Sequence, residues 1–226
     1  MKQKENRDNK SFWDRIAKLY TRIQEKGNKQ LYETLIKKIE AHLSDEQSVL
    51  ELGCGTGQLS LPLASKAKTW LATDFSERMI AEAKKREKSS NLCFCVEDAT
   101  ALSFDSNRFD VVLIANTLHI MPKPKKALEE IYRVLKTDGL LIAPTFVAEE
   151  KIHRLKLWLM KRIGFRVFHS WKLAEFKAFT CQNGFELLQF ELLPASPWPE
   201  CFLVARKSMA PWAKGAISRR CDHGDS

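Results

Sequence analysis

Three glycines at alternating positions form the first group of residues in this chain whose spacing suggests chemistry. Gly53, Gly55 and Gly57 follow the mostly apolar run Val49–Leu52, and Asp74 ends the next apolar run, 21 residues after Gly53. Glycine lets a backbone turn tightly and approach a ligand without a Cβ in between. In α/β folds, a strand, a glycine turn, a helix and then a carboxylate about 20 residues on hold an adenosine-bearing cofactor, with the carboxylate on the ribose hydroxyls. The spacing predicts such a site.

The position of the third glycine separates two classes of cofactor. A dinucleotide fingerprint reads G-x-G-x-x-G and would place its last glycine at Gln58, whereas this chain reads G-x-G-x-G. Together, E-L-G-C-G-T-G at Glu51–Gly57 and T-D at Thr73–Asp74 closely resemble the S-adenosyl-L-methionine (S-adenosylmethionine) site of class I methyltransferases. The resemblance runs from about Trp13 to Val204 and is strongest between Val49 and Ala143. A nicotinamide-dependent dehydrogenase is the distant alternative.

The resemblance implies a set of cofactor contacts at the carboxyl ends of the first strands. Asp74 would accept from both ribose hydroxyls, and Asp98 would accept from the adenine exocyclic amine. The Ala99 N–H would face the adenine ring, and the apolar Phe75 would pack on it. A turn or helix-cap role is the alternative for Asp98. The expected cofactor-binding residues are Tyr20, Glu51, Gly53, Cys54, Gly55, Gly57, Asp74, Phe75, Asp98, Ala99 and Asn116.

The segment A-N-T-L-H-I at Ala115–Ile120 would face the transferable methyl group in such an enzyme. It matches neither N-P-P-Y nor D-P-P-Y, the motifs of enzymes that methylate exocyclic base amines. It resembles instead the small-molecule and lipid-precursor branch, including ubiquinone/menaquinone-biosynthesis-type methyltransferases. His119 is the candidate catalytic base for an oxygen or carbon acceptor, because histidine titrates near neutrality, and a structural histidine is the equal alternative. His153 and His169 are weaker candidates.

Composition and charge limit the class of protein. A chain of 226 residues, 44% hydrophobic and 29% charged, is typical of one soluble domain with a proper core. No apolar run approaches the roughly 18–20 residues that cross a bilayer, and the N-terminal residues lack the apolar centre of a secretory signal, so we expect a cytoplasmic protein. Residues 151–226 hold 13 Lys/Arg against 6 Asp/Glu, out of a net charge of +9. That excess suggests an anionic small molecule, a nucleic acid or an anionic membrane surface as partner, or merely a basic surface.

The six cysteines show no C-x-x-C pair, and no histidine cluster at zinc spacing accompanies them. Buried free thiols are the favoured interpretation, including Cys93 and Cys95 in an expected strand, and a reducing compartment is consistent with it. We therefore expect metal-independent chemistry.

Apolar periodicity predicts the elements that position these residues. Residues 1–10 are polar and expected to be disordered, and residues 11–45 show two amphipathic helices. In the first helix, Phe12-Trp13-Asp14 and Tyr20 resemble the family's helical N-terminal lid over the cofactor, and packing in the core is the alternative for these aromatic residues. In the second helix, apolar residues share one face of Lys29–Leu43. Seven strands are expected, at Ser48–Leu52, Thr69–Thr73, Leu92–Val96, Val111–Ala115, Leu140–Ala143, Phe185–Leu192 and Cys201–Arg206.

Helices alternate with these strands. They are expected at Gly57–Ala67, Glu77–Lys88, Lys125–Leu135 and Lys172–Asn183. Ser76 is the expected N-cap of the second, and Asp138 is expected to accept left-handed geometry in the turn before the fifth strand. The fold class is α/β, a Rossmann-like, mostly parallel sheet with helices on both faces. The resemblance implies an antiparallel last strand. The expected methyltransferase domain spans residues 11–207, with a candidate substrate cap at 147–171 and a tail at 208–226.

The function expected from these patterns is methyl transfer from S-adenosylmethionine to a small or amphipathic acceptor, for which an anionic group fits the basic charge. Displacement at a sulfonium methyl has an excellent leaving group, so positioning and desolvation can supply much of the rate. An RNA methyltransferase using the basic C-terminal third is the first alternative. A non-catalytic cofactor-binding protein is the second.

Overall fold

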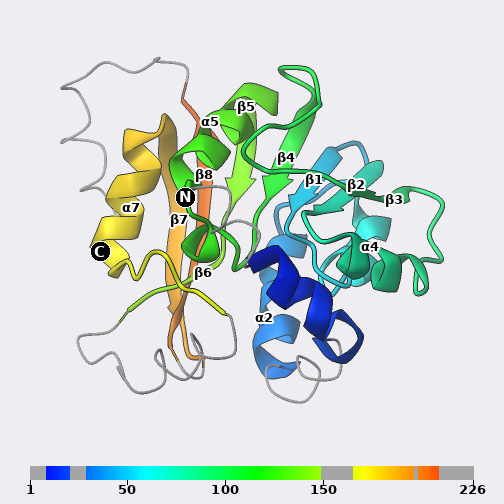
Figure 1. Cartoon of the computed structure of the whole chain (residues 1–226). Helices are drawn as coiled ribbons and strands as arrows, with labels where there is room; N and C mark the ends of the chain where they lie inside the picture. Colours follow the sequence, from blue (N-terminus) through cyan, green and yellow to red (C-terminus); the bar gives the residue numbers. More distant parts are fainter. Residues whose placement is uncertain (1–8, 21–28, 149–164, 196–197, 209–226) are drawn as a thin grey trace.

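A single mixed sheet forms the centre of the protein in the computed structural model, which describes residues 9–20, 29–148, 165–195 and 198–208 (Figure 1). The strands are β1 Ser48–Leu52, β2 Thr69–Asp74, β3 Leu92–Val96, β4 Phe109–Leu113, β5 Leu135–Ile142, β6 Thr145–Phe146, β7 Phe185–Leu193 and β8 Glu200–Lys207. Their order is β3-β2-β1-β4-β5-β8, and β6 and β7 also pair with β8. Strands β1 to β5 pair with one another in parallel, whereas β8 is antiparallel to β5, β6 and β7.

This topology confirms the predicted α/β sheet with an antiparallel last strand. The described residues contain one strand more than the seven expected, because β6 pairs with β8 immediately after Pro144. A proline has no N–H to donate to a ladder, so it separates β5 from β6. The expected turn before the fifth strand lies within β5, where Asp138 has a left-handed φ of 60°.

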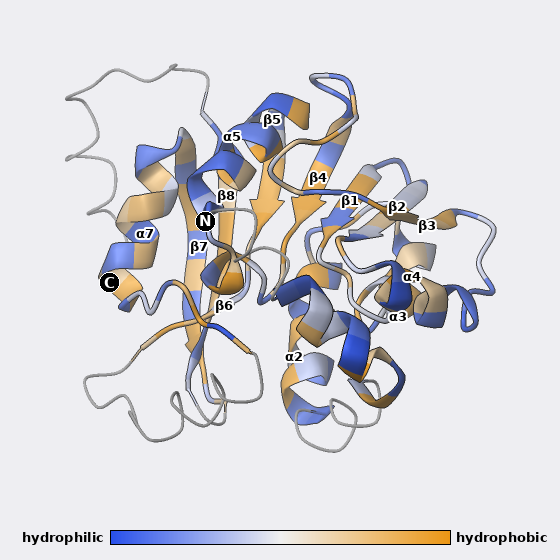
Figure 2. Ribbon diagram, in the orientation of Figure 1, coloured by the Kyte–Doolittle hydropathy of each residue, from blue (hydrophilic) through white to orange (hydrophobic). Residues whose placement is uncertain are grey.

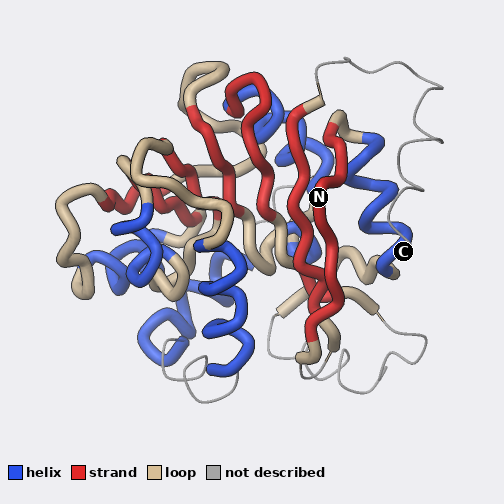
Figure 3. Tube along the Cα trace, turned by 180° about the vertical axis from the view of Figure 1, so that it is seen from behind, coloured by secondary structure: helices blue, strands red, loops and turns tan. Residues whose placement is uncertain are grey.

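Helices cover both faces of the sheet, as predicted (Figures 1 and 3). Three helices, α2 Lys29–Glu40, α3 Ser60–Leu63 and α4 Glu77–Lys84, contribute to one hydrophobic core. On the opposite face, α5 Pro124–Val134 and α7 Leu173–Gln182 contribute to a second core. Figure 2 shows the central strands β4, β5 and β8 mostly in the hydrophobic colour, as expected for strands buried on both faces.

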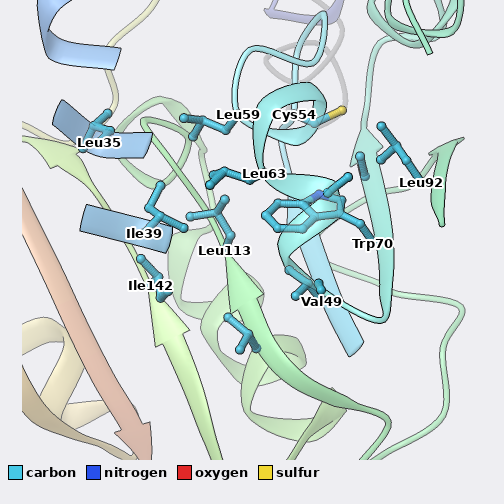
Figure 4. Close-up of a cluster of buried hydrophobic side chains, with 14 of the residues drawn as sticks. Leu35, Ile39, Val49, Cys54, Leu59, Leu63, Trp70, Leu92, Leu113 and Ile142 are labelled. Atoms are coloured by element: carbon cyan, nitrogen blue, oxygen red, sulfur yellow. The ribbon is translucent and has the colours of Figure 1, made fainter. Parts of the chain in front are cut away.

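The first core fixes the strands that carry the glycine turn and Asp74. Figure 4 shows Leu35 and Ile39 of α2 near Leu63 and Leu113, with Trp70 of β2 beside them. Each of these side chains is at most 1% exposed, so together they hold α2 firmly on the sheet.

Several element boundaries differ from those expected. The first crossover helix does not begin at Gly57, because that residue has a φ of 86°, outside the right-handed helical region. It is reduced to α3 and the 3₁₀ turn η1 Ala64–Lys66. Helix α4 ends at Lys84, earlier than expected, but its predicted N-cap is confirmed, since the Ser76 hydroxyl accepts from the Met79 N–H at 3.1 Å.

The described part of the N-terminal helix includes residues 9 and 10, which were expected to be disordered and are instead helical. Asn9 and Lys10 each bond to a distant segment, and these contacts are invisible to a composition argument. Residues 1–8, most of the expected cap (149–164) and the tail from 209 lie outside the described residues.

The cysteine expectation was partly wrong. Cys54, Cys181 and Cys201 are buried free thiols, but Cys93 is exposed and Cys95 is half-buried. Both lie on β3, where burial alternates along the strand: Leu92 and Phe94 face the core, and the cysteines lie on the opposite, more exposed face.

Candidate functional site

A cavity of about 160 Å³ lies where the first four parallel strands end. Ligands of open α/β sheets bind at the carboxyl ends of the strands, so this is the expected location of a site. Ten of the eleven predicted cofactor-binding residues line it, namely Tyr20, Glu51, Gly53, Cys54, Gly55, Asp74, Phe75, Asp98, Ala99 and Asn116. The fold thus brings together residues spread over almost a hundred positions of the chain.

Gly57 is the predicted residue that does not line the cavity. A Cβ at this position would lie 3.1 Å from the Phe94 ring and 3.2 Å from Leu61. Its glycine is therefore needed for close packing between the turn, α3 and β3.

Gly53 brings two loops of the site into close approach. It has a φ of 71°, and a Cβ there would lie 2.3 Å from the Thr117 hydroxyl oxygen, closer than atoms can pack. Because Thr117 follows β4, the absence of a side chain at Gly53 allows the loops after β1 and β4 to meet at the cavity.

Asp74 links the loops after β1 and β2. Its Oδ2 accepts from the Gly55 N–H at 2.9 Å, and its Oδ1 accepts from the Ser76 N–H at 2.8 Å. Burial raises the pKa of this carboxyl to about 6, although the two backbone N–H groups act in the opposite direction. A carboxylate has about four acceptor positions. Asp74 therefore retains capacity for two ribose hydroxyls.

Glu51 is a buried carboxyl in the cavity wall. Its Oε2 accepts from the Ser60 hydroxyl at 2.5 Å and from the Trp70 indole N–H at 2.9 Å. Burial raises its pKa to about 7, and the two hydrogen bonds lower it. Because Ser60 begins α3 and Trp70 lies on β2, the Glu51 side chain connects the floor of the cavity to both elements.

The predicted adenine end contains Asp98, Ala99 and Phe75. The Oδ1 of Asp98 accepts from both the N–H and the hydroxyl of Thr100 at 2.8 Å, so the turn role considered for it is present. Both bonds use Oδ1, which leaves Oδ2 for a ligand. The Phe75 ring is 40% exposed, and the Lys10 ammonium lies 5.3 Å from its centre.

The helix at residues 9–20 lies beyond the arrowheads of β1 and β4 in Figure 1, and four of its residues, Asn9, Lys10, Trp13 and Tyr20, line the cavity. It is bonded on two sides. The Asn9 amide donates to the Ile120 carbonyl at 2.9 Å, and Asp14 accepts from the Ser76 hydroxyl at 2.5 Å. Trp13 and Tyr20 line the cavity with their rings edge to face, 5.5 Å apart. The position agrees with a lid, and movement as a lid stays a prediction.

Asn116 marks the end of the cavity nearest β4. It has a φ of 51°, and its N–H donates to the Pro144 carbonyl at 2.8 Å. Its side-chain Nδ2 donates to Oε1 of Glu200 at 3.2 Å. Glu200 is fully buried, and burial raises its pKa to about 7.

Sequence reasoning missed Glu200 and two aromatic residues of the cavity wall, Trp13 and Tyr32. Glu200 stands alone at the start of the last strand, and no local pattern marks it. Trp13 belongs to the lid-like motif, which could have suggested a contact. Tyr32 follows Leu31 on α2 and bonds to Tyr20, a contact with no local signal.

His119 lies outside this cavity. It is 7% exposed and lines a second cavity of about 20 Å³, together with Phe146, His169 and Trp198. The His119 carbonyl accepts from the His169 N–H at 3.0 Å, which places the two histidines side by side. Burial, followed by the nearby His169, lowers the pKa of His119 to about 4, so its ring is neutral at pH 7. His153 lies outside the described residues.

The described residues contain neither a metal-binding cluster nor a membrane-spanning helix. No group of three or more His, Cys, Asp or Glu side chains there is arranged to hold a metal ion. No helix in the same ranges is long and apolar enough to span a membrane.

Comparison with known proteins relates the chain to methyltransferases. The family profile described as "Methyltransferase domain" matches residues 50–143. The demethylmenaquinone methyltransferase of Clavibacter sepedonicus is 33% identical over 140 residues, covering 60% of this chain and 57% of that protein. The ubiquinone/menaquinone biosynthesis C-methyltransferase of Rickettsia bellii is 37% identical over 109 residues, which are 44% of each chain. The chain thus spans about half the length of these curated relatives.

Solved structures share the fold. The methyltransferase in a complex with a methyltransferase activator from Haloferax volcanii has a TM-score of 0.73 at 19% identity, covering 87% of this chain and 97% of that one. A magnesium protoporphyrin IX methyltransferase from Synechocystis with bound S-adenosylhomocysteine has a TM-score of 0.61 at 22% identity, covering 79% and 83%.

Proposed function

Because the chain belongs to the class I S-adenosylmethionine-dependent methyltransferases, we propose that its main cavity binds S-adenosylmethionine and that the protein methylates a small, amphipathic aromatic acceptor. The relatives named as demethylmenaquinone and ubiquinone/menaquinone methyltransferases suggest a hydroquinone-like acceptor. An anionic group on the acceptor would suit the basic chain. The comparisons do not favour an RNA methyltransferase or a non-catalytic protein.

The observation that carries this proposal is the position of Asp74 in the cavity wall. Its carboxylate is held by the N–H groups of Gly55 and Ser76, so its direction is fixed before a ligand arrives. A preorganised carboxylate binds ribose hydroxyls without an entropy cost for ordering its own side chain.

The chain's residues would mainly bind, orient and exclude water. The cofactor, when bound, supplies a methyl group on a sulfonium that is a good leaving group. Gly53 and Gly55 permit close backbone approach, and Phe75 and Ala99 would flank the adenine. Trp13 and Tyr20 would cover the cofactor from the side of the N-terminal helix and keep water from the methyl group.

His119 remains the candidate base for an oxygen or carbon acceptor. Its pKa of about 4 leaves the imidazole neutral, and its Nδ1 is buried with no hydrogen-bond partner among the described residues. A neutral imidazole can accept a proton. For His119 to act as the base, the acceptor must extend from the main cavity into the second cavity, where His119 lies. The Leu118–Ile120 turn contributes residues to both cavities.

Calorimetric titration with S-adenosylhomocysteine, beside the same titration with NADH, tests the cofactor. We expect micromolar binding of the first alone, and no binding of S-adenosylhomocysteine would contradict the proposal. Turnover is then measured with S-adenosylmethionine and 1,4-naphthohydroquinone as acceptor, kept reduced under oxygen-free conditions. Salt-dependent binding and methylation of RNA in place of this acceptor would favour the RNA alternative instead.

A further inference from the structure

Asn116 enters the main cavity on a backbone that leaves its side chain little freedom. A positive φ is uncommon for a residue other than glycine, and it persists only where the surroundings hold it. Here the Asn116 N–H is bonded to the Pro144 carbonyl at 2.8 Å. The side chain is therefore aimed by a fixed backbone toward Glu200 on one side, while the residue lines the cavity.

The contact with Glu200 determines which end of the Asn116 amide is free. Above its raised pKa of about 7, the carboxylate of Glu200 is ionised, accepts hydrogen bonds and donates none, so it faces the amide nitrogen. The Nδ2 of Asn116 accordingly donates to Glu200 Oε1 at 3.2 Å. The Oδ1 of Asn116 is left buried and without a hydrogen-bond partner among the described residues.

Burial of Glu200 has no evident packing purpose. The side chain is fully buried at the start of β8, and its Oε2 is also without a partner among the described residues. Burying a carboxyl with an unused oxygen is costly, and such groups are retained where they serve a site. Glu200 does not itself line the cavity, but it is bonded to Asn116, which does, so it lies next to the cavity wall.

Other buried polar atoms without partners gather around the same loop. Seven such atoms are found among the described residues, and six belong to the segments that surround residues 116–121, namely Asn9 Oδ1, Asn116 Oδ1, His119 Nδ1, Thr145 Oγ1, His169 Nε2 and Glu200 Oε2. Asn9 bonds to the Ile120 carbonyl, and Thr145 pairs with Cys201, the neighbour of Glu200. Unused hydrogen-bonding capacity is thus concentrated beside the cofactor cavity, which is where an acceptor would bind.

We propose that Glu200 is a positioning residue that holds the Asn116 amide with its oxygen toward the acceptor, so that the site selects acceptors presenting an O–H or N–H group. This inference rests on the proposed function, because it assigns the polar end of the same cavity to the acceptor. The ammonium group of the cofactor could also donate a hydrogen bond to the Asn116 oxygen. The experiment therefore distinguishes a bond from the acceptor from a bond from the cofactor.

The test compares two ring compounds of similar shape on the protein saturated with S-adenosylhomocysteine. 1,4-Naphthohydroquinone carries two O–H donors, and 1,4-dimethoxynaphthalene carries none. We expect the wild type to bind the hydroquinone about tenfold more tightly, the value of one well-placed hydrogen bond. In Glu200→Gln, the new amide can either accept or donate, so Asn116 is free to turn over and the preference should fall to about threefold or less.

Asn116→Ala removes the oxygen itself and should abolish the preference, which keeps the test decisive if Glu200→Gln folds poorly. Glu191→Gln, at an exposed carboxylate of β7, is the matched control and should keep the preference. Asn116 was expected to bind the cofactor, and the inference assigns its oxygen to the acceptor instead. The affinity for S-adenosylhomocysteine should therefore change less than about twofold in all three variants, whereas one lost hydrogen bond to the cofactor would cost about tenfold.

Three results would overturn the inference. The first is a wild type that binds S-adenosylhomocysteine but does not distinguish the two compounds. The second is a preference that survives in a folded Glu200→Gln variant or in Asn116→Ala. The third is a loss of about tenfold in S-adenosylhomocysteine affinity in Asn116→Ala, which would assign the oxygen to the cofactor's ammonium group. A wild type that does not bind S-adenosylhomocysteine would instead refute the proposed function.

Discussion

The Asp74 carboxylate accepts a hydrogen bond from the backbone N–H of Gly55 at 2.9 Å. Two loops that follow different strands are therefore joined by the side chain that is also expected to bind the ribose. The same group has a structural task and a ligand-binding task, and substitutions must separate them.

Asp74→Asn and Asp74→Ala should both weaken cofactor binding. Asparagine keeps one oxygen for the backbone but loses the charge, so we expect about 10- to 100-fold weaker binding of S-adenosylhomocysteine, the cost of one or two charge-assisted hydrogen bonds. Alanine frees two buried N–H groups and should also lower the free energy of unfolding by about 1–3 kcal/mol. Calorimetry and urea unfolding measure these effects. Asp45→Asn, in an exposed loop, is the control, and unchanged affinity in both Asp74 variants would remove the ribose assignment.

Glu51 should make the protein less stable as the pH rises. Its pKa is about 7 in the folded protein against an ordinary value of 4.5, so the folded state binds the proton more strongly than the unfolded state. The free energy of unfolding therefore falls as the pH rises from about 4.5 to 7, by on the order of 3 kcal/mol from this group. Glu51→Gln should remove that contribution.

Urea unfolding of the wild type and Glu51→Gln at pH 5 and pH 7.5 measures it. Relative to the wild type, the free energy of unfolding of Glu51→Gln should be higher at pH 7.5 than at pH 5. The wild type and the variant are compared at each pH because other groups also change stability with pH. Asp74 and Glu200 have raised pKa values and act as Glu51 does, whereas the lowered pKa of His119 makes the protein more stable as the pH rises. A difference between the two proteins that stays constant would contradict the assignment.

His119→Asn tests the catalytic base. If His119 removes a proton from the acceptor, kcat should fall by about 100-fold or more, while S-adenosylhomocysteine affinity stays within about twofold. Because its pKa is about 4, wild-type turnover should not lose this base until the pH falls toward that value. His42→Asn, at a half-buried histidine bonded to Gln189, is the control. Unaltered turnover in His119→Asn would make the residue structural.

Asp14→Ala tests the N-terminal helix as a lid. Asp14 accepts from the Ser76 hydroxyl, so its loss should loosen the helix over the cavity. We expect faster dissociation of S-adenosylhomocysteine and about 3- to 10-fold weaker binding, from one lost hydrogen bond to a charged group. Stopped-flow dissociation measures it, with Arg15→Ala, an exposed residue of the same helix, as the control. Equal dissociation rates in the two variants would argue against a lid.

The sequence by itself determined the elements and the placement of the glycine turn. Apolar runs, the glycine spacing and the Ser76 cap are local signals, because strand pairing surfaces, tight turns and caps depend on residues close together in the chain. They were enough to predict the parallel sheet and the part of the cavity wall formed by the glycine turn and Asp74, whereas the antiparallel last strand and other cavity residues, such as Asp98 and Ala99, were implied by the family resemblance. Ligands bind at the carboxyl ends of parallel strands, so residues that end such strands can be assigned to one site before their side-chain contacts are known.

Only the tertiary structure decided which side chains meet and which way they point. Glu200 lies 84 residues from Asn116, and no local pattern predicts their hydrogen bond. His119 and Asn116 are three residues apart, yet His119 lines the second cavity and Asn116 the first, because His119 lies within the 3₁₀ turn Leu118–Ile120, which redirects the chain. Gly57 belongs to the glycine motif but packs against Phe94. Such directions follow from packing between distant segments, which a linear sequence does not display.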